Sequence, residues 1–306
     1  MLQLLADGLV VGSTIALGAV GVTLTYSILR FANFAHGEFL AWGAYLALTA
    51  LAAFTAVLGP MRPLGPFTFG WPLLGALLVA APLTAGLALL VDRALFARLR
   101  ERGGAITLVI ASFGAALALR NLLLFLYGGV PELYTREIPI AWRLLPRDVL
   151  GGLRITPDQL FVLGVAAACV VGLHLFLTRT TLGKAMRAVS LNPQLARVSG
   201  IDVEAVTRWT WAIGATLACV AGVFAGLTVQ LRPQIGFDLL LPLFAAAILG
   251  GIGSVWGAVI GGLVVGLAES LSVPLVGAEY RAATAFGVLI AILLARPTGL
   301  FRGEGG

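Results

Sequence analysis

The feature that most limits how this chain can fold is its series of long, almost uncharged apolar stretches. A helix of about 20 apolar residues crosses the roughly 30 Å hydrocarbon core of a bilayer. Of the 306 residues, 59% are hydrophobic and 11% are charged, with a mean hydropathy of +1.01, whereas soluble domains carry about 25% charged residues. The sequence therefore predicts an all-α, polytopic transmembrane helical bundle that forms a single domain over residues 1–306.

These stretches predict about eight membrane segments. One region, Phe237–Val273, is too long for one plain helix and is interrupted by Gly250, Gly251, Gly253 and Gly257. It predicts a glycine-broken hairpin of tilted or half-length helices, which either re-enters the membrane or crosses it twice. The plain spans are expected near Gly8–Leu29, Phe39–Leu58, Leu73–Ala97, Ala105–Tyr127, Gln159–Leu177, Trp209–Leu231 and Ala282–Ala295.

Positive charge is concentrated in two connections, Arg93–Arg102 and the segment 178–208, which we expect on the cytoplasmic side. No Lys or Arg precedes the first span and Arg30 follows it, so we expect a retained span with an external N-terminus rather than a signal peptide. Arg296 and Arg302 favour a cytoplasmic C-terminus. The net charge of +6 then reflects topology and contact with the lipid membrane, rather than nucleic-acid binding.

The longest connection expected outside is 128–157, which includes Tyr134 and Trp142 among prolines and charges of both signs. Its aromatic rings could anchor the loop at the membrane interface, where Tyr and Trp are enriched. Alternatively, the loop receives a soluble partner. The sequence leaves both interpretations open.

The second basic connection begins with an amphipathic stretch. Leu182, Met186 and Val189 recur at helical spacing, opposite Lys184 and Arg187. This pattern predicts a short helix with one apolar face. Alone, it is also compatible with a plain amphipathic helix lying in the membrane interface.

A second short helix is predicted directly afterwards. Asn192 followed by Pro193 is typical of an N-cap and first helical residue, and Gly200 is typical of a helix stop, so the helix should end at Ser199. We call the region Gly183–Gly200 the knob, because two short helices lying along the membrane form a rigid protrusion that can transmit force.

The most polar cluster near a membrane edge is Asn33-Phe34-Ala35-His36-Gly37-Glu38, between the first two spans. The simpler interpretation places it at the water interface. Gly37, and the lack of Lys or Arg after Arg30, instead favour a helix that begins inside the bilayer, where an ionisable group is costly and usually functional. Glu38 could then meet an ammonium group. Other polar residues at or near the spans are Arg120, Asn121, Gln230, Asp238 and Glu269.

Small residues recur at four-residue spacing, which lets helix backbones approach closely in lipid. They are Gly214, Ala218, Gly222 and Gly226, then Gly257 with Gly261, and Gly262 with Gly266. The glycine string around Gly251 and Gly253 has no Gly-Lys-Ser/Thr after it, so it does not predict a nucleotide site. It is either a structural break between helices or exposed backbone that lines a watery cavity.

The sequence offers no catalytic or metal-binding constellation. Its two histidines, His36 and His174, have no metal-ligand spacing, and its two cysteines, Cys169 and Cys219, both lie within apolar runs. An intramembrane enzyme is therefore poorly supported, and we expect no metal site.

Several motifs together resemble one family, the LivH-type permease subunits of bacterial branched-chain amino acid ABC importers. The resemblance covers nearly the whole chain, and the combination is specific although each motif alone is weak. It rests on Arg30–Phe39 with Gly43-Ala44-Tyr45, on Thr181–Ala188 through Gly200-Ile201, and on Leu249–Ser254, Gly257-Ala258 and Pro297-Thr298-Gly299.

This resemblance implies an ATP-driven importer in the bacterial inner (plasma) membrane. Its expected partners are a second permease subunit, a different and LivM-like chain, two cytoplasmic ABC ATPase subunits and an external substrate-binding protein. ATP and Mg would be used by the partner ATPase, with no cofactor on this chain. The substrate implied is a branched-chain or other hydrophobic amino acid.

The same resemblance suggests roles for individual residues. The knob would sit in a cleft of the ATPase, and the broken helix would line part of the path. The expected coupling residues are Gly183, Lys184, Arg187, Ala188, Asn192, Pro193 and Gly200, and the expected substrate-pathway residues are Asn33, His36, Glu38, Gln230, Asp238, Gly251 and Gly253.

Two alternatives for the function stay open. Related permeases carry urea and short amides, and the Asn33–Glu38 stretch does not separate them from amino acid permeases. A stand-alone channel for a small neutral solute would need neither an ATPase nor a knob.

Overall fold

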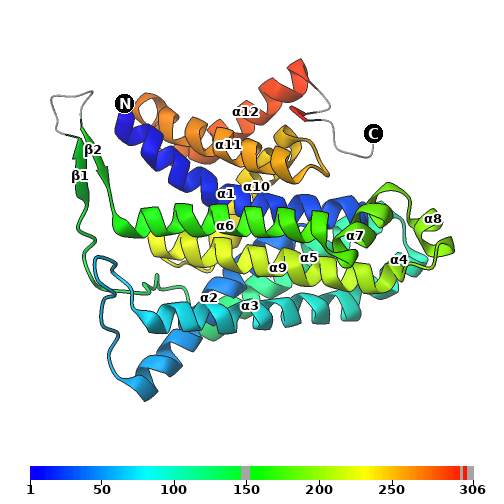
Figure 1. Cartoon of the computed structure of the whole chain (residues 1–306), viewed down its shortest axis with the longest axis horizontal. Helices are drawn as coiled ribbons and strands as arrows, with labels where there is room; N and C mark the ends of the chain where they lie inside the picture. The colour runs from blue at the N-terminus through cyan, green and yellow to red at the C-terminus, as the bar shows by residue number, and fades with distance from the viewer. Residues whose placement is uncertain (146–151, 297–298, 302–306) are drawn as a thin grey trace.

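The computed structural model describes residues 1–145, 152–296 and 299–301, and these are almost entirely helical (Figure 1). Pro297, Thr298 and Arg302, used above for the family resemblance and for the C-terminal topology, lie outside the described residues. So does the middle of the connection 128–157. In chain order, the elements are α1 (Leu2–Leu29), α2 (His36–Leu58), α3 (Trp71–Val91), the π-helix η1 (Asp92–Phe96), α4 (Ala97–Arg102), α5 (Ala105–Tyr127), β1 (Trp142–Leu145), β2 (Leu153–Ile155), α6 (Pro157–Arg179), α7 (Thr181–Leu191), α8 (Pro193–Val198), α9 (Val203–Thr228), α10 (Ile235–Gly250), α11 (Val255–Val276), the 3₁₀ helix η2 (Ala278–Tyr280) and α12 (Arg281–Ala295).

The described chain contains seven helices that are long and apolar enough to cross a membrane, and α10 is a shorter apolar helix. This confirms the predicted polytopic helical bundle. The predicted hairpin is α10 followed by α11, with the break at Gly251–Ser254; α10 has 16 residues, whereas α11 has 22 and is a full-length span. Only the first of the two helices is therefore short.

The third span is longer than the sequence pattern indicated. Instead of giving way to a loop after Ala97, the helix continues through η1 and α4 to Arg102. The guanidinium of Arg100 donates two hydrogen bonds to the carboxylate of Asp92, at 2.7 and 3.1 Å. This ion pair holds the two ends of the extension together, so the basic connection is a helix rather than a flexible segment.

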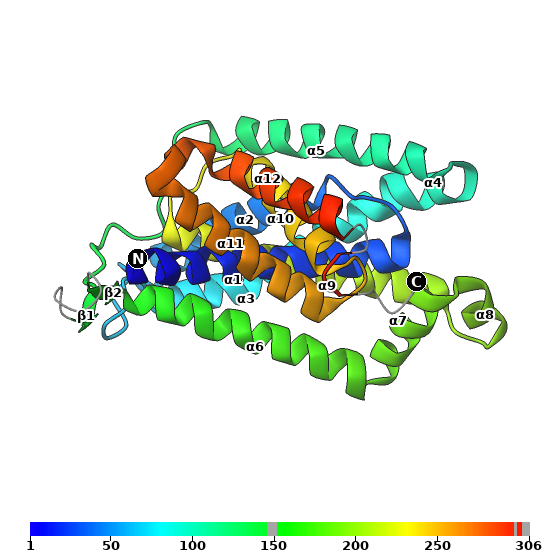
Figure 2. The same ribbon diagram turned by 90° about the horizontal axis from the view of Figure 1, so that it is seen from above.

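Helix α1 is the centre of the bundle, and its side chains are buried almost throughout between α9 and α11. Figure 2 shows α5 and α6 on opposite outer sides, with α1 between them. The knob lies at one end of the bundle and the β1–β2 hairpin at the other, on the same side as the N-terminus (Figure 1). We call these the knob end and the hairpin end.

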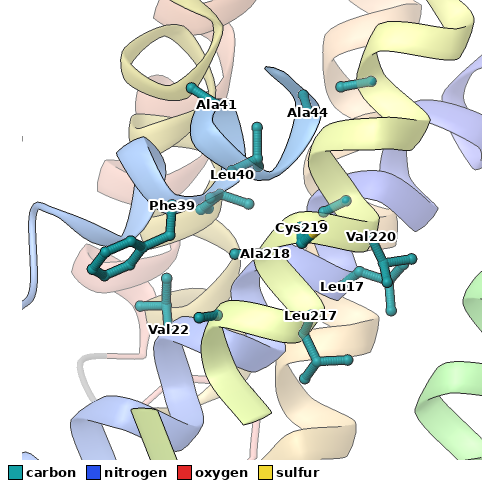
Figure 3. Close-up of a cluster of buried hydrophobic side chains, with 14 of the residues drawn as sticks. Leu17, Val22, Phe39, Leu40, Ala41, Ala44, Leu217, Ala218, Cys219 and Val220 are labelled. Atoms are coloured by element: carbon teal, nitrogen blue, oxygen red, sulfur yellow. The ribbon is translucent and has the colours of Figure 1, made fainter. Parts of the chain in front are cut away.

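The small residues predicted to allow close packing do so. A Cβ atom at Gly222 of α9 would overlap the carbonyl oxygen of Leu40 in α2, and one at Gly266 of α11 would overlap the backbone of Gly12 in α1. Around these contacts the side chains of α1, α2 and α9 interlock, with Cys219 in the middle (Figure 3). The bundle is therefore held by backbone proximity as well as by large side chains.

The connection 128–157 is more structured than a loop. Strands β1 and β2 pair antiparallel, and Glu132 forms an isolated bridge with Leu231. Tyr134 is buried, and its hydroxyl donates a 2.7 Å hydrogen bond to the carbonyl oxygen of Ala44, so this ring does not act as an interfacial anchor. Burial raises the pKa of the Tyr134 hydroxyl well above its usual range. Trp142 is exposed, as an interfacial aromatic residue would be.

Candidate functional site

Helix α2 begins inside the bundle rather than at its surface. Arg30 has φ 58°, which ends α1 in a left-handed turn and sends the chain back toward the interior. The ring of His36, the first residue of α2, packs against Gly21 of α1. Gly21 lies about 12 Å below the end of α1 at Leu29, from the helical rise of about 1.5 Å per residue. The first polar residues of α2 are thus at membrane depth.

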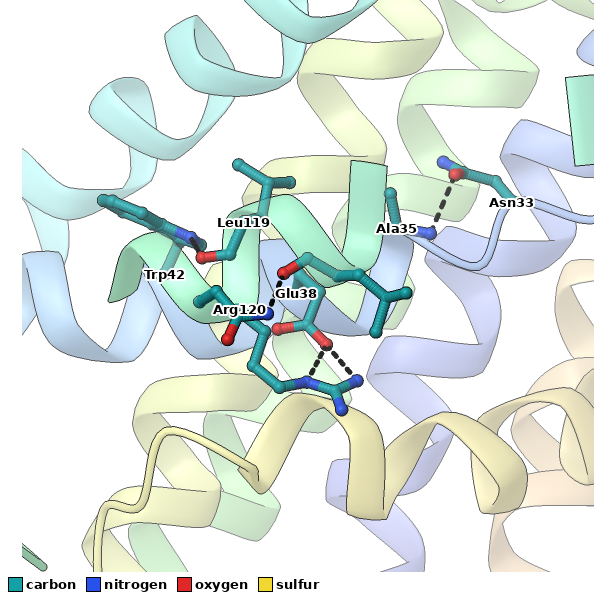
Figure 4. A network of polar contacts seen from close by, with 8 residues as sticks. Asn33, Ala35, Glu38, Trp42, Leu119 and Arg120 are labelled. Carbon is teal, nitrogen blue, oxygen red and sulfur yellow. Dashed lines mark hydrogen bonds and ion pairs between the residues drawn. The ribbon is translucent and has the colours of Figure 1, made fainter. Parts of the chain in front are cut away.

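Glu38, in the first turn of α2, is 1% exposed and paired with Arg120 of α5 (Figure 4). The Nη2 and Nε atoms of Arg120 donate to Oε1 of Glu38 at 2.9 and 3.2 Å. Oε2 of Glu38 has no hydrogen-bond partner among the described residues. A buried carboxylate is tolerated when it is paired, so the ion pair explains how Glu38 can sit here, and it leaves one acceptor unused.

Helix α10 completes this arrangement. The guanidinium carbon of Arg120 lies 4.2 Å from the centroid of the Phe237 ring, a cation–π contact. Asp238 follows on the same turn, is exposed, and is close enough to interact electrostatically with both Arg120 and Glu38. Glu38, Arg120, Phe237 and Asp238 form what we call the polar cluster, which combines one cation, two carboxylates and an aromatic ring.

The close approach of α2 and α10 places the cluster. A Cβ atom at Gly37 would overlap the carbonyl oxygen of Gly236, and one at Gly236 would overlap that of Gly37. Only glycines at both positions let the first turns of the two helices touch in this way. Any larger residue would separate Glu38 from Asp238.

The predicted pathway residues do not all come together. Asn33 and His36 are buried near the start of α2, where the His36 ring packs against Gly21 of α1, and the Oδ1 of Asn33 accepts a 3.1 Å hydrogen bond from the backbone of Ala35. Gln230 is exposed in the connection that leads into α10. Gly251 and Gly253 lie beyond the opposite end of α10, about 20 Å from Asp238 by helical rise. The structure therefore does not bring these glycines to the polar cluster.

Arg120 is a polar residue of the spans to which the sequence pattern assigns no role. It is the one charged residue in α5, a helix of 23 residues. A lone arginine in an apolar span is costly unless it is paired or functional. The isolation of Arg120 in an apolar helix was the signal that the sequence offered. The partner of Arg120, which is Glu38, could be identified only from the fold.

The polar backbone groups at the glycine break between α10 and α11 are hydrogen-bonded within the chain. The N–H groups of Leu300 and Phe301 donate to the carbonyl oxygens of Leu249 and Gly250, at 2.8 and 3.3 Å. The Ser254 hydroxyl accepts from the N–H of Gly257 and caps α11. These contacts satisfy the helix ends within the chain and favour the structural interpretation of the break.

The knob consists of the two helices that the sequence predicted. Asn192 caps α8 by accepting a 3.0 Å hydrogen bond from the N–H of Leu195, and Gly200 has φ +83° just after the helix. Met186 and Val189 of α7 are each 1% exposed and pack into the bundle, against residues that include Leu24 and Ile28 of α1. On the other face, Lys184 and Arg187 are exposed.

The knob is also fixed to the membrane helices by contacts at both ends of α7. Gly183 lies against the backbone of Phe176 and Leu177, so α7 turns directly on the last residues of α6. At the other end of α7, the Arg30 guanidinium donates to the carbonyl oxygen of Ser190. The tip is apolar and uncovered in this chain: Leu191, Leu195 and Val198 are 59%, 63% and 86% exposed. An exposed apolar tip on a rigid mount is suited to docking.

Comparison with known proteins places the chain in a family. The chain is 33% identical over 300 residues to the high-affinity branched-chain amino acid transport system permease protein BraD of Pseudomonas aeruginosa, covering 98% of this chain and 95% of that protein. It is 33% identical to the permease protein LivH of Escherichia coli K12 over 98% of this chain and 94% of LivH. It is 30% identical to the probable permease LivH of Methanocaldococcus jannaschii over 97% and 91%. Residues 4–294 match the family described as "branched-chain amino acid transport system / permease component", and the chain, a multi-pass membrane protein, belongs to that family.

Proposed function

We propose that this chain is the membrane permease subunit of an ATP-driven importer for branched-chain or other hydrophobic amino acids. The observation that carries the proposal is the knob, a rigid pair of helices with an apolar tip that is mounted on α6 and on the start of the α1–α2 connection. A stand-alone channel has no need of such a part. The names of the relatives give the substrate class.

The proposal divides the work among several subunits. Two cytoplasmic ABC ATPases bind ATP and Mg, hydrolyse the ATP and grip the knobs. The second permease is a different, LivM-like chain, and an external binding protein delivers the substrate. The chain lies in the bacterial inner membrane with the knob end and the C-terminus in the cytoplasm and the N-terminus outside, which agrees with the basic residues gathered at the knob end.

The polar cluster supplies a recognition site for a zwitterion along the path. An amino acid carries a carboxylate and an ammonium group, and both are costly in hydrocarbon unless they are paired. Arg120 has donors to offer a carboxylate, while Asp238 and the unused Oε2 of Glu38 can accept from an ammonium group. The Phe237 ring, which lies against Arg120, suits an apolar side chain.

Movement of the knob reaches this site through a short connection. Arg30, which contacts the knob at Ser190, is followed by the five-residue segment 31–35, which leads into α2 and Glu38. Displacement of the knob by ATPase closure therefore pulls on the buried start of α2. At the same time it tilts α6, on which α7 is mounted.

Charge reversal on the knob tests the coupling. The chain is reconstituted in vesicles with its ATPase, its partner permease and its binding protein, and ATP hydrolysis and uptake of radiolabelled leucine are measured together. The double variant Lys184→Glu/Arg187→Glu should lose most uptake while ATP hydrolysis no longer responds to the loaded binding protein. Arg98→Glu, an exposed charge at the same end on α4, is the control and should transport normally. Normal coupling in the double variant would contradict the proposal.

Two further measurements separate the alternatives. In the same vesicles, excess unlabelled urea or acetamide should not compete with leucine uptake; competition would indicate an amide permease. Uptake by this chain alone, without ATP or an ATPase, would indicate a channel instead.

A further inference from the structure

A cleft at the knob end is not used by the proposed transport mechanism. It has a volume of about 760 Å³ and lies between the α3–η1–α4 extension, the end of α1, and the region around α8 and the start of α9. Four of the residues that line it are arginines, namely Arg93, Arg100, Arg197 and Arg208. It is therefore a strongly cationic concave surface.

The acidic residues in and beside the cleft neutralise only some of these arginines, because Arg208 also lies 4.0 Å from Asp202. Asp92 is occupied by Arg100 through the two hydrogen bonds at 2.7 and 3.1 Å. Glu204 is the other acidic lining residue. Arg93 and Arg197 make no ion pair within the described ranges 1–145, 152–296 and 299–301. Two guanidinium groups, one from η1 and one from α8, are thus available to an anion.

Apart from Thr207, the rest of the lining is apolar. Leu29 is the last residue of α1, and Leu89 lies one turn before α3 passes into η1. Ile28 and Val203 add to this apolar part. The cleft therefore offers cations and hydrocarbon side by side, at the level where the spans reach the headgroups. Free phosphate would use only the cationic part.

The backbone next to Arg93 is also unusual. The cleft wall includes the start of η1, a five-residue π-helix, and both Asp92 and Arg93 belong to it. A π-turn inside an α-helix is rare and is found frequently at functional sites. Here it includes Arg93, one of the four arginines of the cleft.

We propose that this cleft binds the phosphate-bearing headgroup of an anionic phospholipid, with Arg93 and Arg197 contacting the phosphate and the apolar lining contacting the start of the acyl chains. Basic pockets between membrane helices on the cytoplasmic side bind such headgroups. Because Arg197 belongs to α8 of the knob and Arg93 to η1, a bound lipid connects the knob to the α3 extension. The lipid thereby limits how far the knob can move.

The test uses the purified full-length chain in mild detergent, with lipid binding followed by native mass spectrometry. Phosphatidylglycerol should bind to the wild-type protein more tightly than phosphatidylcholine does. The double variant Arg93→Gln/Arg197→Gln should bind phosphatidylglycerol at least about tenfold more weakly than the wild type, since each basic residue near a membrane surface contributes substantially to the attraction. Both side chains are exposed, so the variant should fold, and circular dichroism checks this.

The control is Arg98→Gln/Arg179→Gln, which removes the same charge from exposed positions at the same end, outside the cleft. It should bind phosphatidylglycerol as the wild type does. Equal weakening in the two double variants would show a general charge effect and overturn the proposal, as would equal binding of phosphatidylcholine and phosphatidylglycerol by the wild type. If glycerol phosphate displaces phosphatidylglycerol at a similar concentration, the ligand is a soluble phosphate and the lipid assignment is wrong.

Discussion

The Arg30 guanidinium donates a hydrogen bond to the carbonyl oxygen of Ser190, and so joins the end of α1 to the end of α7 across 160 positions of sequence. Arg30 occupies a left-handed turn, from which the chain returns into the bundle toward α2. One residue therefore contacts the proposed docking element and also begins the segment that leads to the polar cluster. A substitution at Arg30 should therefore interrupt the transmission of movement from the knob to the polar cluster while leaving the tip of the knob and the cluster residues unchanged.

Replacing Arg30 by Gln should weaken the transmission of movement from the knob to the polar cluster. The shorter neutral side chain loses the charged donor to Ser190, so the knob can move without pulling on the segment 31–35. We expect uptake in reconstituted vesicles to fall about tenfold, as for the loss of a charge-assisted hydrogen bond worth roughly 1.5–3 kcal/mol, while basal ATP hydrolysis continues. Arg98→Gln serves as the control. Equal losses of uptake and of basal hydrolysis would point to a folding defect instead.

The Glu38–Arg120 pair predicts a characteristic pattern of stability. Removing one partner leaves a buried charge unpaired, which costs about 3–5 kcal/mol, whereas replacing both partners by apolar residues is often neutral. Glu38→Met and Arg120→Met should each lower the thermal unfolding temperature in detergent, and the double variant should recover most of it. The pair is 82 positions apart in sequence.

Transport measurements distinguish a purely structural Glu38–Arg120 pair from one that contacts the substrate. The stable double variant should still lack uptake, because neither the carboxylate nor the guanidinium is present for the substrate. Glu38→Gln keeps the size of the side chain and should lower uptake as well. Transport that survives in both variants would remove the polar cluster from the pathway.

Local features of this fold could be predicted from the sequence, and long-range ones could not. The Asn192 cap of α8 and the left-handed Gly200 just after the helix follow from side-chain and backbone chemistry within a few residues, so the knob was predicted nearly to its ends. The partner of Glu38 depends on how α2, α5 and α10 come together, which no local pattern contains. The continuation of α3 through η1 was missed for a related reason, because the Asp92–Arg100 pair that spans it is visible only once the helix is built.

Close helix packing predicts that replacing two glycines by Ala has different effects on stability. A Cβ atom at Gly262 would lie 2.5 Å from the Cα of Ala16, whereas one at Gly164 of α6 would meet nothing within 4 Å. Gly262→Ala should therefore lower the free energy of unfolding by about 1–3 kcal/mol through overpacking. Gly164→Ala should leave it unchanged or raise it by up to about 1 kcal/mol through helix propensity. Thermal unfolding in detergent measures both; equal effects would show that the α1–α11 contact is looser than described.

The orientation of the knob can be tested by crosslinking. Gln194 is exposed on α8 beside the apolar tip, and replacing it by Cys keeps the Asn192 cap intact. In a background in which Cys169 and Cys219 are replaced by Ala, Gln194→Cys should crosslink to the ATPase and resist a membrane-impermeant thiol reagent added to intact spheroplasts. Trp142→Cys in β1, at the hairpin end, should show the reverse. Labelling of Gln194→Cys from outside, or crosslinks that never capture a nucleotide-hydrolysing subunit, would mean that the knob is not the contact with the ATPase.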